Sequence, residues 1–173
     1  MHKPAHVVEI FLNPGEFYIG DQDTRIRTVL GSCVSITMWH PRLLVGGMCH
    51  YMLPRRQGQE YGQPDGKYAD EAFALMVEGI GVKGAPINEY VVKMFGGGNM
   101  FPLGRRGEQH HVGRKNAEAG RDLVKRHGLR TYAEDLEGVG HRTVLFDIWS
   151  GHVWVRKFQP AAGFCGALKD EQA

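Results

Sequence analysis

Two side chains, the thiol of Cys33 and the imidazole of His50, have the types and the spacing for nucleophilic catalysis. Cys33 lies in the string Leu-Gly-Ser-Cys-Val, and His50 lies in the string Cys-His-Tyr-Met-Leu-Pro. A cysteine becomes an effective nucleophile when an adjacent base removes its proton, and histidine is well suited to that task near neutral pH. The pair is therefore the minimum apparatus for a cysteine nucleophile with a general base.

A β-hairpin between the two residues predicts that they meet. Its two strands are 34–39, rich in β-branched and aromatic residues, and 44–51, with a Pro-containing turn between them. If Trp39 pairs with Leu44 across this four-residue loop, Cys33 faces His50 directly, with Cβ atoms roughly 4.5–5.5 Å apart. A three-residue loop would instead place the two side chains on opposite faces of the sheet. The predicted dyad therefore depends on the turn.

The residues before the cysteine strengthen the catalytic interpretation. A lone buried cysteine usually packs as a small hydrophobic residue. Gly31 and Ser32, however, let the backbone bend so that the thiol and its own N–H project into a cleft. There the Cys33 N–H can stabilise an oxyanion, with Ser32 as a second possible donor.

Metal and nucleotide chemistry are not expected. Cys49 should point to the face of its strand opposite His50, into the core. Strand alternation therefore separates the ligands of any zinc site built from Cys33, Cys49 and His50, and the sequence has no Cys-x-x-Cys motif. The triple glycine 96–98 matches neither common phosphate-loop pattern, and it predicts a tight strand exit that lets backbone approach a partner or the cleft. The neighbouring carboxylates Glu134 and Asp135 are expected to be structural or exposed.

Length and composition predict one domain, 1–173, with a flexible tail at 160–173. The hydrophobic content of 42% and the charged content of 23% are ordinary for a globular protein. There is neither an apolar run of about 18 residues nor an apolar leader, so membrane insertion and secretion are not expected. Three cysteines do not make a disulfide framework, which indicates the cytosol. A net charge of +2 is too small and too dispersed to indicate nucleic-acid binding.

Hydrophobic periodicity predicts an α+β fold with a mixed sheet or sandwich. Outside the hairpin, which is expected over 29–53, strands are predicted at 7–11, 16–19, 90–95, 130–134, 143–148 and 153–158. Helices are predicted from residue 69 to about residue 80 and from about 113 to 127. The polar loop 54–66 is expected to be a surface excursion or a lid.

Taken together, these strings resemble the CheD family of chemoreceptor glutamine deamidases. The resemblance is carried by 15–18 (Gly-Glu-Phe-Tyr), 28–34 (Thr-Val-Leu-Gly-Ser-Cys-Val), 46–54 (Gly-Gly-Met-Cys-His-Tyr-Met-Leu-Pro), 67–70 (Lys-Tyr-Ala-Asp), 95–100 (Phe-Gly-Gly-Gly-Asn-Met), 113–116 (Gly-Arg-Lys-Asn) and 151–155 (Gly-His-Val-Trp-Val). It implies the fold of cysteine hydrolases related to the cytotoxic necrotizing factor toxins, a mixed β-sandwich flanked by helices.

The resemblance also implies a catalytic triad. Cys33 would be the nucleophile, His50 the general base and acid, and an upstream threonine would orient the histidine. Thr28 is the natural third member, although some members carry that threonine one residue further from the cysteine, where this chain has Arg27. Neighbours on a strand point to opposite sides, so at most one of the two can face the imidazole. We favour Thr28, because a hydroxyl can accept a hydrogen bond and an arginine cannot.

The implied activity is that of a protein-glutamine glutaminase acting in chemotaxis. The Cys33 thiolate, formed by His50 or present as a thiolate–imidazolium pair, would attack glutamine side chains on the cytoplasmic helical bundle of methyl-accepting chemoreceptors. A thioester would then be hydrolysed to glutamate without a metal or cofactor. The alternative is a non-catalytic regulatory module that binds receptors or a CheC-type phosphatase, and a third possibility is a cysteine hydrolase or transglutaminase for another protein amide.

Overall fold

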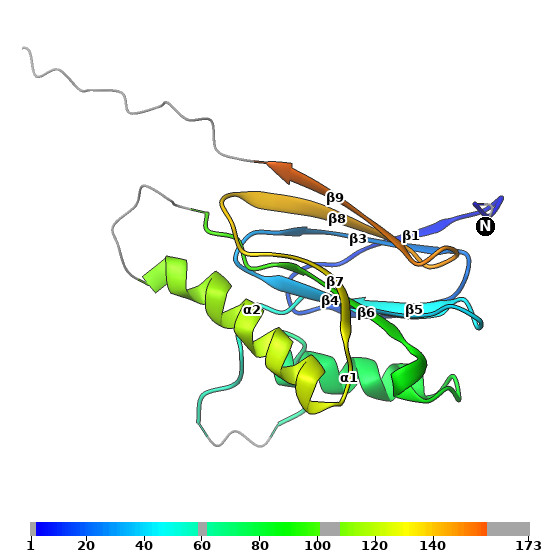
Figure 1. The fold of residues 1–173 in the computed structure, drawn as a ribbon, viewed down its shortest axis with the longest axis horizontal. Coiled ribbons are helices and arrows are strands. Elements are labelled where there is room, and N and C mark those ends of the chain that lie inside the picture. Colours follow the sequence, from blue (N-terminus) through cyan, green and yellow to red (C-terminus); the bar gives the residue numbers. More distant parts are fainter. Residues whose placement is uncertain (1–2, 59–61, 101–107, 159–173) are drawn as a thin grey trace, which may run out of the picture.

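A computed structural model describes residues 3–58, 62–100 and 108–158, and the predicted flexible tail lies outside these residues (Figure 1). Two β-sheets and two α-helices make up the described part, which confirms the predicted α+β class. Sheet A has the strand order β1-β3-β8-β9, and sheet B has the order β2-β5-β4-β6-β7. The strands are β1 Val8–Phe11, β2 Phe17–Gly20, β3 Thr24–Leu30, β4 Val34–His40, β5 Val45–Cys49, β6 Val91–Gly96, β7 Thr131–Leu136, β8 His141–Asp147 and β9 His152–Phe158.

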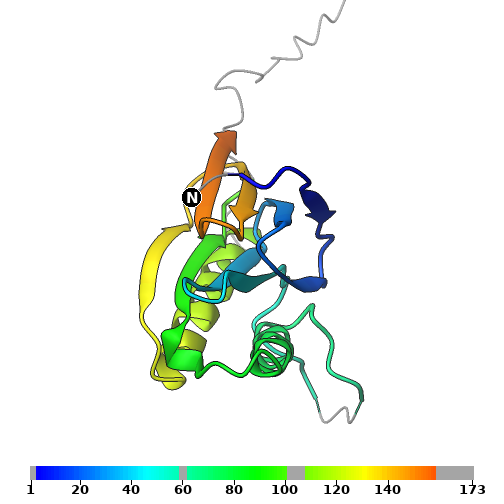
Figure 2. The same ribbon diagram turned by 90° about the vertical axis from the view of Figure 1, so that its right-hand side faces the viewer.

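The elements form three layers. Sheet A packs on one face of sheet B, and the helices α1 (Ala69–Gly81) and α2 (Glu108–Arg126) cover the other face (Figures 1 and 2). The core has two parts, one between the sheets and one between sheet B and the helices. Because sheet B is covered on both sides, β4 is buried along nearly its whole length, including the polar side chains of Ser35 and Thr37.

Strand β3 was not predicted as a separate element, and the predicted hairpin start at Val29 is wrong. β3 lies inside sheet A, parallel to β1 and antiparallel to β8. Its side chains alternate strictly, with Thr24, Ile26, Thr28 and Leu30 buried. The two arginines between them mask this pattern in the sequence. Helix α2 also differs from the prediction, because it begins at Glu108 rather than near Gly113.

The predicted hairpin register is wrong by two positions on one strand. His40 pairs with Val45 and Trp39 with Gly46, whereas the expected partner of Trp39 was Leu44. The loop still has four residues, but it is moved one position along the chain because the ring of His40 holds it. His40 Nδ1 lies 3.3 Å and 3.2 Å from the backbone N–H groups of the next turn, at residues 42 and 43. A shift of two positions leaves every side chain on its predicted face. The predicted direct pairing of Cys33 with His50 is wrong, however, because the neighbouring residues Val34 and Tyr51 are the ones that pair.

Candidate functional site

Cys33 and His50 lie at the same end of neighbouring strands of sheet B. Cys33 directly precedes β4 and His50 directly follows β5, and the residues next to them, Val34 and Tyr51, form an antiparallel bridge. The side chain of Cys33 is half-buried and packs against the core between the sheets. The ring of His50 also points toward sheet A, because it contacts Thr28 of β3. Both reactive side chains therefore lie on the face of sheet B that meets sheet A.

A hydrogen bond between the two sheets orients the imidazole. Thr28 Oγ1 lies 2.8 Å from His50 Nδ1 and 2.8 Å from the carbonyl oxygen of Leu12. A carbonyl can only accept, so the single hydroxyl proton of Thr28 goes to Leu12, and the hydroxyl oxygen accepts the proton of Nδ1. This arrangement selects the tautomer in which Nε2 carries a free lone pair, as a general base requires.

Arg27 lies on the other side of β3. Its guanidinium pairs with Glu9 at 3.2 Å and lies over the ring of Phe11, on the face of sheet A that is turned away from sheet B. Of the two possible partners of His50, the structure therefore brings only Thr28 to the ring. The contact also depends on the N-terminal segment, since Leu12 holds the hydroxyl and the backbone of Gly15 and Glu16 holds the backbone of His50.

Burial favours the neutral form of the His50 imidazole. The residue is only 2% exposed, and its Nε2 has no hydrogen-bond partner among the described residues. Loss of hydration lowers the His50 pKa from 6.5 to about 4, although the Leu12 carbonyl and the charge of Glu16 act in the opposite direction. The imidazole is therefore neutral at pH 7, with a free lone pair on Nε2.

The thiol of Cys33 is protonated in the same resting state. Burial raises its pKa above the ordinary value, and its own backbone N–H offsets part of that effect. These two directions favour a neutral thiol and a neutral imidazole over the thiolate–imidazolium pair that the sequence left open. Nε2 of His50 makes no hydrogen bond to Cys33 Sγ, since it has no partner among the described residues. A thiol in this neutral state becomes a good nucleophile only when its proton is removed.

The neutral pair predicts a specific pH dependence of thiol reactivity. We expect alkylation of Cys33 by iodoacetamide to accelerate about tenfold per pH unit between pH 6 and 8, because the thiolate is the reacting form and its pKa is raised. Peptide-resolved mass spectrometry would follow Cys33 separately from the other cysteines. A rate that is already maximal and flat across this range would contradict the neutral pair.

Three consecutive backbone carbonyls around Cys33, those of residues 31–33, accept hydrogen bonds from other segments. The carbonyl of Gly31 accepts a hydrogen bond from Gly98 N–H, and that of Cys33 accepts one from Gly97 N–H, both at 2.8 Å. The carbonyl of Ser32 accepts a hydrogen bond from the side chain of Asn116 on α2. The triple glycine is thus the strand exit at which backbone approaches residues 31–33. At Gly96, with φ +117°, a Cβ would lie 2.2 Å from the Cys33 carbonyl oxygen.

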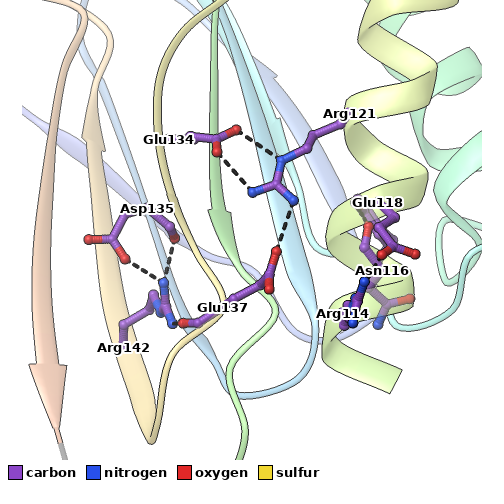
Figure 3. Close-up of polar contacts among 9 residues, drawn as sticks. Arg114, Asn116, Glu118, Arg121, Glu134, Asp135, Glu137 and Arg142 are labelled. Atoms are coloured by element: carbon purple, nitrogen blue, oxygen red, sulfur yellow. Dashed lines mark hydrogen bonds and ion pairs between the residues drawn. The ribbon is translucent and has the colours of Figure 1, made fainter. Parts of the chain in front are cut away.

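The remaining reactive residues serve packing or ion pairs. Cys49 is fully buried in the core on the helix side, and this burial raises its thiol pKa to about 12. Glu134 and Asp135 are each bound by an arginine (Figure 3). Arg121 of α2 binds Glu134 at 2.9 Å, whereas the buried Arg142 binds the carboxylate and the backbone carbonyl of Asp135. Neither carboxylate is therefore free for acid–base chemistry.

The described residues contain neither a cluster of metal-binding side chains nor a helix that could span a membrane. No group of three or more histidine, cysteine, aspartate or glutamate side chains in residues 3–58, 62–100 and 108–158 is arranged to hold a metal ion. Within the same residues, neither helix combines the length and the apolar character needed to span a membrane.

Sequence reasoning missed two buried residues: Asn116, which contacts the backbone beside Cys33, and Arg142, which binds Asp135. Asn116 is buried in α2, and its side chain binds the carbonyl of Ser32. An amide side chain in a helical sequence normally indicates a solvated face, so the sequence did not predict this contact. Arg142 is among the largest fully buried side chains, a position that arginine rarely occupies without a partner. For Asn116 the only signal was its place in the string Gly-Arg-Lys-Asn.

Comparisons with known proteins give a consistent result. The family model described as "CheD chemotactic sensory transduction" matches residues 52–157. A protein of Pseudomonas fluorescens named "Probable chemoreceptor glutamine deamidase CheD" is 48% identical over 158 residues, covering 90% of this chain and 88% of the relative. A relative in Dechloromonas aromatica with the same name, numbered 3, is 45% identical over 88% of this chain and 89% of the relative. A relative in Leptospira interrogans, numbered 1, is 40% identical over 90% of this chain and 96% of the relative. This chain belongs to the CheD family.

Proposed function

We propose that this protein is a cytoplasmic protein-glutamine deamidase that converts glutamine side chains of methyl-accepting chemoreceptors to glutamate. One observation carries the chemistry: the Thr28 hydroxyl binds Nδ1 of His50, and the lone pair of the buried Nε2 remains without a described partner on the face that Cys33 shares. The names of the relatives support the substrate, since they are deamidases of chemoreceptor glutamine. The proposed fold relationship is to the cysteine hydrolases of the cytotoxic necrotizing factor type.

The proposed reaction has two halves. First, Sγ of Cys33 attacks the carboxamide carbon while Nε2 of His50 takes the thiol proton. The Cys33 N–H, with Ser32 as a possible second donor, stabilises the tetrahedral oxyanion. The C–N bond then breaks, and the imidazolium gives its proton to the departing ammonia.

In the second half, a water molecule attacks the thioester, with His50 again acting as the base. The C–S bond breaks, the proton on His50 returns to the sulfur, and glutamate remains on the substrate. Each turnover therefore consumes one water and releases one ammonia. The protein's own side chains supply every proton transfer.

The test is an intact-mass measurement on the cytoplasmic fragment of a chemoreceptor from the same organism. We expect incubation with the protein to add the mass difference between a carboxamide and a carboxylic acid at each modified glutamine, together with released ammonia. Free glutamine should release none, because the proposed partner is the helical bundle of the receptor. No mass change, with stable binding to the fragment or to a CheC-type phosphatase, would instead support the non-catalytic regulatory module.

Removal of the Thr28 hydroxyl should slow turnover without stopping it. We expect Thr28→Ala to lower the deamidation rate about ten- to a hundredfold, by analogy with the loss of a residue that orients a catalytic histidine. Thr28→Ser should recover most of the rate, because it keeps the hydroxyl that bridges Leu12 and His50. Steady-state kinetics on the receptor fragment would measure both variants.

Arg27→Ala is the matched control on the neighbouring position of β3. Its side chain lies on the outer face, so we expect an effect on receptor docking that weakens with salt, and little effect on the turnover of bound substrate. If Thr28→Ala turns over the fragment at the parent rate, the imidazole does not need the threonine for its orientation.

A further inference from the structure

One buried side chain connects the residue before Cys33, the proposed nucleophile, to the segment that follows His50. Asn116 of α2 has no solvent exposure, and its amide nitrogen donates two hydrogen bonds (Figure 3 shows its place on the helix). One goes to the carbonyl oxygen of Ser32 at 3.0 Å and the other to that of Met52 at 2.7 Å. The amide thus bridges the residue before Cys33 and a residue two positions after His50.

The bond to Ser32 also fixes a second group, the N–H of Cys33. The two belong to the same peptide unit, which is planar and trans, so the carbonyl of Ser32 and the N–H of Cys33 point in opposite directions. As long as Asn116 holds the carbonyl toward α2, the N–H must point away from α2. A flip of this peptide would break the hydrogen bond to Asn116.

In the remaining direction, the N–H of Cys33 lies near the sulfur and can act on the reacting groups. It approaches the sulfur of its own side chain closely enough to lower the Cys33 pKa against the effect of burial. In a tetrahedral intermediate, the oxyanion is bonded to the carbon that the sulfur has attacked, next to that sulfur. An N–H held on the sulfur side can therefore reach the oxyanion.

We propose that Asn116 is a positioning residue for transition-state stabilisation: its carboxamide holds the Ser32–Cys33 peptide so that the Cys33 N–H faces the developing oxyanion. Hydrogen bonding at the Ser32 oxygen also polarises the same peptide and makes its N–H a stronger donor. This inference rests on the proposed deamidase mechanism. It separates two tasks, because Thr28 orients the base from sheet A and Asn116 orients the oxyanion donor from the helix layer.

The test compares a reaction that forms an oxyanion with one that does not. Asn116→Leu keeps the approximate shape of the side chain, but it has no hydrogen to donate to the two carbonyls. We expect the kcat for deamidation of the receptor fragment to fall about 10²-fold, with little change in KM. Alkylation of Cys33 by iodoacetamide, which develops no oxyanion, should keep the parent rate and pH profile.

Tyr51→Phe is the matched control. The Tyr51 hydroxyl donates to the backbone carbonyl of Asn116 at 2.7 Å, so this variant loses a buried hydrogen bond at the same residue without releasing Ser32. We expect a lower melting temperature and a kcat close to that of the parent. If Asn116→Leu does not fold, Asn116→Ser replaces it. Its short hydroxyl has a single hydrogen and cannot hold both carbonyls, so the same split between kcat and alkylation is expected.

Two results would overturn the inference. A kcat that stays at the parent value would show that the amide does not act in catalysis, and an equal loss of deamidation and alkylation would show that it acts on the thiol instead. Both leave the proposed function intact as long as the parent protein releases ammonia from the receptor fragment. If the parent releases none, the proposed function itself fails.

Discussion

Replacement of Cys33 by alanine is expected to abolish deamidation, with a loss of at least about 10⁴-fold. Without the sulfur no thioester can form, and the water-dependent half of the reaction has no substrate. The fold should persist, because the side chain is small, half-buried and free of side-chain hydrogen bonds to other described residues. Intact-mass analysis of the receptor fragment measures the activity, and thermal unfolding checks the fold.

Cys49→Ala is the control for this variant. It also removes one thiol from sheet B, but Cys49 lies in the core on the helix side, away from the face of Cys33 and His50. We expect it to lower stability, since a buried side chain is truncated, and to keep the turnover of the folded protein. Ammonia release by Cys33→Ala above a few per cent of the parent rate would refute the assignment of Cys33 as the nucleophile. If both variants fold and both are inactive, the loss of activity is not specific to Cys33.

The second large effect is expected at His50. His50→Ala should cost nearly as much as Cys33→Ala, because a neutral thiol with a raised pKa is a poor nucleophile unless a base removes its proton. The double variant should be no slower than Cys33→Ala alone, since nucleophile and base act as a unit. The measurement is single-turnover mass analysis of the receptor fragment at pH 7.

His40→Asn provides a second buried histidine for comparison. His40 is also only 2% exposed, but it lies at the turn end of β4 and holds the hairpin loop through Nδ1. Asparagine can supply a similar acceptor, so we expect this variant to keep its turnover. Retention of activity by His50→Ala would mean that another group accepts the thiol proton. A double variant slower than Cys33→Ala would show that His50 contributes without Cys33.

The hairpin shows what local patterns can predict. Residues 34–51 read correctly as two strands and a four-residue turn, and the faces of Cys33 and His50 follow from alternation even though the register is shifted. The shift itself depends on His40, whose ring holds two turn amides. A proline-containing turn gives no sign of that interaction.

Tertiary contacts account for what the sequence did not predict. β3 was not recognised because Arg25 and Arg27 alternate with its apolar residues, and each arginine is compensated by an acid from another strand. Asn116 could not be assigned, since its two acceptors lie 84 and 64 residues away along the chain. The contact of Thr28 with His50, in contrast, involves a residue that strand alternation and hydrogen-bonding capacity had favoured over Arg27.

The hydrogen bond between Thr28 and His50 makes the position of the imidazole, the base of the proposed mechanism, depend on the thickness of the core. Its two ends belong to different sheets, and sheets that pack face to face are separated by about 10 Å of interlocked side chains. Residues such as Ile26 and Phe146, which fill that layer and touch no reacting atom, therefore act as spacers that determine whether a hydroxyl and a ring nitrogen stand 2.8 Å apart. Because protein interiors are nearly incompressible, this spacing is rigid. In the proposed mechanism, the packing of the core therefore positions the general base as well as stabilising the fold.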